Sequence, residues 1–154
     1  PKANPNNLRL NFASMKPLPS VYGKGEKITL HALKTTPIHG KWLNLGGGDG
    51  RYLSKLLTRV TKIISTDNST AKINALSKRI PKKYNEKIDF VVHDFTKRFP
   101  FQSETFDGVI FTGVMHLYPP AKMKKTLGEV NRVLKRKGRL IIDCATESQR
   151  ISLE

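Results

Sequence analysis

The chain has 154 residues, enough for one domain around a single core. It carries 28 Lys and Arg against 12 Asp and Glu, a formal net charge of +16 at pH 7. Its apolar runs are far shorter than the ~20 residues that cross a bilayer, so no membrane span is expected. The single cysteine, Cys144, excludes a disulfide within the chain and favours a reducing compartment, so we expect a cytoplasmic protein. Four isolated histidines and this cysteine give no metal-ligand spacing, and no bound metal is expected.

The excess positive charge is spread along the sequence and does not form a tail. A dispersed basic surface favours polyanionic partners, either nucleic acid or an anionic membrane surface. The alternative is a lysine-rich surface without such a partner. We favour this alternative because no arginine-rich stripe with interleaved aromatic residues is present. The oligomeric state is not indicated by the sequence.

Predicted helices and strands alternate along most of the chain. Four apolar residues in one segment follow the i, i+3, i+4, i+7 spacing of an amphipathic helix: Leu53, Leu56, Leu57 and Val60. We predict strands at 42–45, 62–66, 88–92, 108–112 and 139–144, and helices at 25–34, 51–60, 69–80 and 121–134. The cations at 135–137 suit the negative end of the last helix, and Gly138 suits the position just past it. This order predicts an α/β fold, a Rossmann-like parallel sheet of about five strands with flanking helices.

In such a sheet the ligand lies beyond the carboxyl ends of the strands, so the residues that follow each strand deserve inspection. The first predicted strand is followed by a glycine-rich turn that contains Gly46, Gly48 and Gly50. Such a turn lets the backbone approach a ligand closely, although a tight turn without a ligand is the alternative. The spacing does not match the G-x-G-x-x-G dinucleotide pattern, because Arg51 or Leu53 would occupy the last glycine position.

Acidic residues follow the second and third predicted strands. Asp67 is placed to accept hydrogen bonds from both hydroxyls of a ribose, with Asn68 beside it. The alternative is that one of the residues 67–69 caps the next helix. Asp94 is placed to accept from the exocyclic amine of adenine, with Phe95 or a neighbour flanking the ring. The alternative there is an ordinary acidic loop residue.

The segment after the fourth predicted strand holds small and polar residues. Thr112 and Gly113 would line the path of an extended ligand, because glycine leaves room for it. His116 is the histidine nearest this edge and would either orient an acceptor or act as a base. A packed or solvent-facing histidine is the alternative.

Five motifs stand in order in the sequence, and together they are more specific than any one of them. They are WLNLGGGDG at 42–50, IISTD at 63–67, VVHD at 91–94, FDGVIFTGVMHL at 106–117 and EVNRVLKRKGRLII at 129–142. The ordered set resembles the class I S-adenosylmethionine (SAM)-dependent methyltransferases over roughly residues 40–145. It is most similar to the branch that includes ubiquinone/menaquinone-biosynthesis methyltransferases and other enzymes of small molecules.

The resemblance implies SAM as the cofactor and a role for each motif. The three glycines would wrap the methionine and ribose of SAM, Asp67 would hold the ribose hydroxyls, and Asp94 would meet the adenine. Residues 112–114 would line the sulfonium side. The resemblance also implies three regions: an irregular lead-in with a short helix at 1–39, the SAM-binding core at 40–147 and a tail at 148–154.

The sequence departs from the family pattern in two places. Asn44 stands where the family usually has Asp or Glu, a side chain that helps to order the glycine turn. The chain also stops soon after the fifth predicted strand, before the antiparallel strands that usually complete the fold. We therefore expect a truncated chain with an open sheet edge that is prone to pairing or to partial instability.

Three functions are consistent with these observations. We favour a SAM-dependent methyltransferase that acts on a small-molecule acceptor. The net charge favours an RNA or other nucleic-acid methyltransferase as the alternative. A non-catalytic SAM-binding domain is the third hypothesis, prompted by Asn44 and by the missing strands.

Overall fold

The structure is a computed structural model, and it describes residues 27–143. The elements in chain order are α1 (Lys27–Thr35), β1 (Lys41–Leu45), α2 (Leu53–Leu57), β2 (Lys62–Asp67), α3 (Thr70–Ser77), the 3-10 turn η2 (Lys82–Tyr84), β3 (Ile88–Val92), β4 (Phe106–Phe111), the 3-10 turn η3 (Met115–Leu117), α4 (Pro120–Val133) and β5 (Leu134–Ile142). Within this range, no helix is long and apolar enough to cross a membrane.

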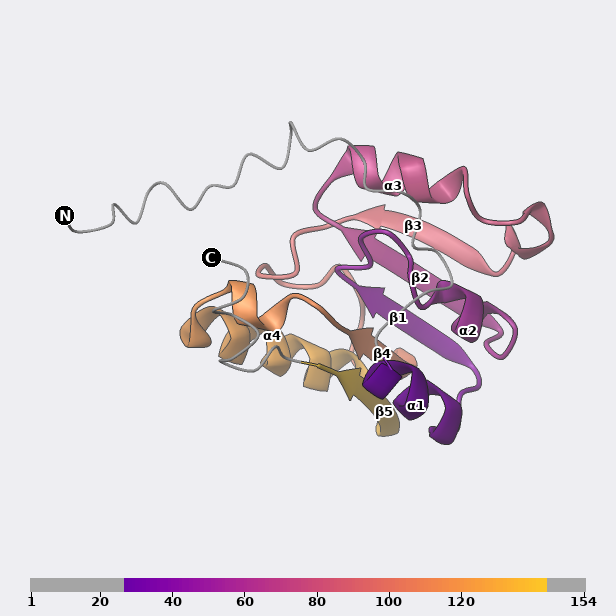
Figure 1. Cartoon of the computed structure of the whole chain (residues 1–154). Coiled ribbons are helices and arrows are strands. Elements are labelled where there is room, and N and C mark those ends of the chain that lie inside the picture. The colour runs from indigo at the N-terminus through magenta and orange to yellow at the C-terminus, as the bar shows by residue number, and fades with distance from the viewer. Residues whose placement is uncertain (1–26, 144–154) are drawn as a thin grey trace.

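The five strands form one sheet in the order β3-β2-β1-β4-β5, and every neighbouring pair is parallel (Figure 1). This confirms the predicted Rossmann-like fold. The chain runs outward from β1 to β3 and then returns to β4 on the other side of β1. Beside β1 the strand order therefore reverses, which is where α/β sheets usually bind their ligands.

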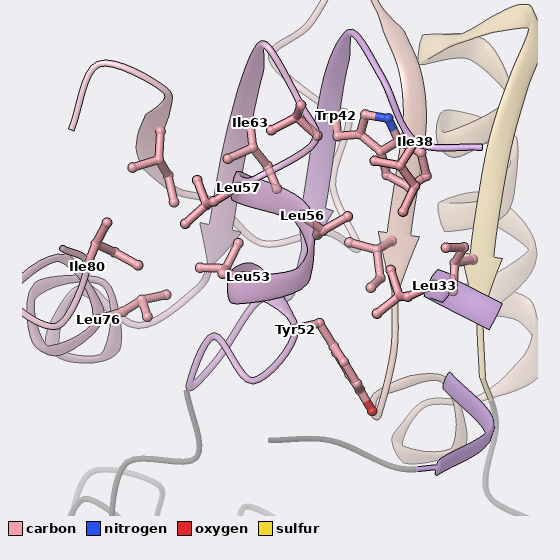
Figure 2. Close-up of a cluster of buried hydrophobic side chains, with 14 residues drawn as sticks. Leu33, Ile38, Trp42, Tyr52, Leu53, Leu56, Leu57, Ile63, Leu76 and Ile80 are labelled. Carbon is pink, nitrogen blue, oxygen red and sulfur yellow. The ribbon is translucent and has the colours of Figure 1, made fainter. Parts of the chain in front are cut away.

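Each face of the sheet is covered by helices that bury apolar side chains. On one face, α1, α2 and α3 contribute Leu33, Leu56 and Leu76 to a buried cluster that also contains Trp42 (Figure 2). On the other face, α4 contributes Met123, Val130 and Val133, which pack with Phe106 and Phe111 of β4. Close packing on both faces holds the strands in place, and this fixes the positions of the residues at the carboxyl ends of the strands.

Two predicted elements differ most from their bounds in the structure. The second helix is a five-residue segment, because turns occupy the positions before Leu53 and after Leu57. The last strand begins at Leu134, directly after α4, and ends at Ile142. The prediction that the cations at 135–137 and Gly138 end a helix is therefore wrong. Leu134 pairs with Phe106 of β4, and this pairing takes the chain into the sheet without a glycine cap.

Several sequence-based expectations lie outside the described residues. These are the irregular lead-in before residue 27, the tail and Cys144, so the three predicted regions stay predictions. Within the described range β5 is an edge strand, and Leu140 and Ile142 are partly exposed on it. The described strands are all parallel.

Candidate functional site

The glycine turn leaves β1 at Leu45 and is held by β2. The Gly47 amide donates to the carbonyl of Thr66 over 2.7 Å, and the Gly50 amide donates to the Gly47 carbonyl over 2.8 Å. Gly46, Gly48 and Gly50 all have positive φ, at 63°, 49° and 73°. L-residues with a side chain rarely adopt this conformation, so the turn depends on glycine at these positions.

The space beside each glycine shows whether protein packing explains why that position is glycine. A Cβ at Gly47 would collide with Asn44, and a Cβ at Gly50 would collide with Leu76 of α3, so protein packing accounts for both glycines. A Cβ at Gly48 would meet no atom closer than 3.8 Å, and one at Gly113 would meet none within 4 Å. Open space therefore lies beside Gly48 and Gly113, which is where a ligand would need it.

Asn44 supports the turn from below. It is buried at 7% exposure, and its Nδ2 donates to the Ser65 hydroxyl of β2 over 3.0 Å. Its side chain also lies directly under Gly47. Asn44 thus contacts the turn from within the protein, and its role toward a cofactor stays a prediction.

Asp67 ends β2 and joins the glycine turn to the start of α3. It is buried at 6% exposure, its Oδ2 accepts from the Gly48 amide over 3.0 Å, and its Oδ1 accepts from the Ser69 amide over 3.0 Å. The N-cap of α3 is Ser69, whose hydroxyl accepts from the Lys72 amide over 3.3 Å. Among the candidates that the sequence left open, the helix cap is therefore Ser69. Asn68 is exposed beside the carboxylate.

Asp94 follows β3, which lies next to β2. Its Oδ1 accepts from both the amide and the hydroxyl of Thr96, over 2.9 and 2.7 Å. Burial raises the pKa of Asp94, but the hydrogen bonds from Thr96 and the positive charge of Lys97 outweigh it and hold the pKa below its usual value. Asp94 is therefore an ionised acceptor at neutral pH. The end of β3 is tied to Asp67, whose carbonyl accepts from the His93 amide over 2.9 Å.

Phe95 is part of the core. It is 6% exposed, and its ring makes edge contacts with Phe111 and Tyr118 at centroid distances of 5.2 and 5.1 Å. A Cβ at Gly46 would lie 3.4 Å from this ring, so Phe95 packs beneath the glycine turn.

The segment after β4 is anchored by a residue that sequence reasoning missed. Gly113 has φ of 73°, is exposed, and donates its amide to Asp143 Oδ1 over 2.6 Å. The other oxygen of Asp143 accepts from the Thr29 hydroxyl of α1 over 3.0 Å. Thr112 and His116 are partly buried in the same segment, and His116 lies in η3. The predicted strand at 139–144 included Asp143, whereas β5 ends at Ile142. Asp143 is therefore the residue that follows the strand, which is a position where ligand-binding residues are expected.

Tyr118 is the second residue that sequence reasoning missed. It is partly buried between η3 and α4, and its ring packs on Phe95. Burial raises the pKa of Tyr118, and the negative charges of Asp94 and Asp67 raise it further. No short-range pattern distinguished this tyrosine from a surface residue.

The described residues hold no cluster of three or more His, Cys, Asp and Glu side chains that could bind a metal. The edge instead brings together backbone amides at glycines, two carboxylates and an aromatic ring. Asp67 of β2 links the three strand ends, because its carboxylate accepts from the Gly48 amide after β1 and its carbonyl accepts from the His93 amide after β3. This arrangement can bind a polar ligand with hydroxyl and amine donors.

A family model described as a methyltransferase domain matches residues 43–138, which is most of the described chain. The chain belongs to this methyltransferase family. The match spans every motif from the glycine turn to the start of β5. The finer resemblance to the ubiquinone/menaquinone-biosynthesis branch is not tested by it and stays a prediction.

Solved structures share this fold. The PH0226 protein of Pyrococcus horikoshii is 30% identical with a TM-score of 0.65, over 75% of this chain and 54% of that one. A SAM-dependent methyltransferase described as putative, from Methanococcus maripaludis, is 19% identical with a TM-score of 0.64, over 82% and 58%. YcgJ of Bacillus subtilis is 23% identical with a TM-score of 0.66, over 74% and 48%. The chain thus spans about half the length of these proteins. A comparison with curated proteins found no match.

Proposed function

We propose that the chain forms the SAM-binding core of a methyltransferase that acts on a small-molecule acceptor. The observation that supports this most is the hydrogen bond from the Gly48 amide to Asp67, which places open backbone beside a buried carboxylate at the reversal of strand order. A ligand with a ribose diol and an extended tail fits that combination. The family match supports the same cofactor.

Asp67 retains acceptor capacity for a ribose. An ionised carboxylate has about four lone-pair sites, and the Gly48 and Ser69 amides use two of them. The two backbone bonds also fix the orientation of the carboxylate before any ligand arrives. We propose that Asp67 accepts from the ribose hydroxyls and that Asn68 borders this subsite.

Asp94 retains a free oxygen for adenine. Both hydrogen bonds from Thr96 fall on Oδ1, and no described residue donates to Oδ2. The lowered pKa keeps the group an acceptor. An exocyclic amine donates hydrogen bonds and does not accept them, so a carboxylate oxygen at this place would select adenine over a purine with a carbonyl there.

When bound, SAM supplies a methyl group on a positively charged sulfur, and transfer is an in-line displacement by the acceptor. The protein contributes position and electrostatics. The open space beside Gly113 would hold the sulfonium side, and the bond from Gly113 to Asp143 fixes that backbone. We propose that Thr112 lines the same path and that His116 orients or deprotonates the acceptor.

The alternatives to this proposal differ in the acceptor of the methyl group. The net charge of +16 favours a nucleic acid as the second candidate, and a non-catalytic SAM-binding domain is the third. We place the reaction in the cytoplasm, on the basis of the single cysteine.

The test is a transfer assay with SAM labelled on its methyl group. The purified chain is incubated with a small-molecule extract, and separately with RNA, at low and at moderate salt. Label in the small-molecule fraction supports the proposal, whereas label in RNA that falls steeply with salt supports the alternative. SAM binding without label in either fraction would contradict an enzymatic role for this chain.

A further inference from the structure

Phe95, which the sequence indicated as a residue flanking the adenine, is too buried to provide the aromatic contact at the predicted subsite. The Phe95 ring is only 6% exposed and is enclosed by Phe111, by Tyr118 and by the glycine turn at Gly46. Its carbonyl also accepts from the buried Thr126 hydroxyl of α4 over 3.1 Å, which fixes the backbone. Phe95 therefore has little ring surface to offer to a ligand.

Tyr118 lies on the outer side of that ring. The two rings meet edge to face at 5.1 Å, and Tyr118 is partly exposed where Phe95 is not. The backbone is constrained on both sides, because Tyr118 closes η3 and Pro119 follows as the N-cap of α4. Tyr118 is thus a supported ring at the edge of the site.

The Tyr118 ring packs on Phe95, the residue that follows Asp94 in the chain. The charges of both Asp94 and Asp67 act on its hydroxyl and, with burial, raise its pKa. The hydroxyl consequently stays protonated at neutral pH and can donate a hydrogen bond.

We propose that Tyr118 forms the aromatic wall of the adenosine subsite, with Phe95 as its support, and that it positions the adenine between its ring and Asp94. This inference rests on the proposed function. Base–aromatic stacking of this kind typically changes affinity by about ten-fold when the ring is removed. Loss of the hydroxyl alone should weaken binding by roughly two- to ten-fold.

The experiment compares the wild-type chain with Tyr118→Leu and Tyr118→Phe. Calorimetry measures binding of S-adenosylhomocysteine and of 5′-methylthioadenosine, which keeps the adenosine but lacks the amino-acid tail. Tyr84→Phe is the matched control, because Tyr84 packs against the cluster on the other face of the sheet. We expect Tyr118→Leu to weaken both ligands by about ten-fold and Tyr84→Phe to leave both unchanged.

A second measurement does not depend on how well the variants fold. The wild-type chain is labelled with 3-fluorotyrosine, and the Tyr118 resonance is identified by its absence in Tyr118→Phe. Methylthioadenosine should shift this resonance and leave that of Tyr84 in place.

The outcomes distinguish a failure of the proposed function from a failure of the Tyr118 assignment. If the wild type binds neither ligand, the proposed function fails and this inference fails with it. If the wild type binds both but neither the resonance nor the affinities respond at Tyr118, the cofactor assignment stands and the Tyr118 assignment is overturned. If only the ligand with the amino-acid tail responds, Tyr118 acts on the methionine side and the adenosine assignment is overturned.

Discussion

The Glu129–Arg132 pair offers a stability prediction with a magnitude that follows from the structure. Arg132 donates to both carboxylate oxygens of Glu129, over 2.8 and 2.6 Å, and to the carbonyls of Phe99 and Phe101 over 3.2 and 2.8 Å. The Phe99 amide donates to Glu129 over 2.8 Å. The pair therefore clamps the connection between β3 and β4 onto α4.

These contacts lower the pKa of Glu129 from 4.5 to about 2, mainly through the hydrogen bonds from Arg132, while burial opposes the shift. At 1.36 kcal/mol per pH unit, this corresponds to about 3.4 kcal/mol. The side chains of Arg132 and Glu129 are 23% and 22% exposed, and solvent screening reduces the contribution to about 2 kcal/mol. Because the folded pKa is below the unfolded one, the contribution is present above about pH 4.5 and is lost as the pH falls towards 2.

Urea unfolding of wild type and Glu129→Gln, followed from pH 7 to pH 3, measures this directly. We expect Glu129→Gln to be about 2 kcal/mol less stable at pH 7, with a difference that shrinks below pH 4.5. Glu86→Gln is the control at an exposed site and should change stability by less than about 0.5 kcal/mol. An equal loss at pH 7 and pH 3 would refute the electrostatic origin, and no loss at pH 7 would refute the clamp.

Three further predictions concern the site. Gly48→Ala should cost about 1–2 kcal/mol of stability, because position 48 has a positive φ. It should also weaken S-adenosylhomocysteine binding, because the new Cβ enters the open space beside the turn. Unchanged calorimetric affinity in a folded variant would contradict the placement of the ligand there. Ser69→Ala should lower stability by about 1 kcal/mol in thermal unfolding and leave cofactor affinity unchanged, and a stable variant would contradict its role as the cap of α3. His116→Ala should lower the turnover of an identified acceptor about 100-fold without changing cofactor affinity, and full turnover would remove His116 from the mechanism.

The sequence predicted the fold because most strands contain a short apolar run next to turn residues, although β5 begins with Leu134 and the cations at 135–137. It also placed Asp67 and Asp94 at the carboxyl ends of β2 and β3, where Asp67 is the last residue of β2 and Asp94 lies two residues past Val92. The end of α4 was predicted to within one residue, but the start of the last strand was wrong, because capping chemistry is local, whereas the pairing of Leu134 with Phe106 depends on residues far apart in the chain. A separate error hid Asp143, because the predicted strand ran on to residue 144 whereas β5 ends at Ile142.

The local sequence also could not distinguish Phe95 from Tyr118. Both are aromatic residues near predicted site positions, and periodicity gives no reason to prefer one. Their difference in burial arises from contacts of Phe95 with Phe111 and with the glycine turn, which only the folded chain brings together. Local sequence therefore predicted an aromatic side chain near Asp94, and packing leaves Tyr118 more exposed than Phe95.

The most direct test of the central claim is calorimetric titration of SAM and S-adenosylhomocysteine into the wild-type chain, Asp67→Ala and Asp67→Asn. Asp89→Ala is the control, because Asp89 is an exposed acidic residue of β3 that pairs with Lys62. We predict saturable binding to the wild type and to the control, and binding at least about ten-fold weaker in both Asp67 variants. A folded wild-type chain that does not bind, or Asp67 variants that bind as tightly as the wild type, would contradict the proposed cofactor site.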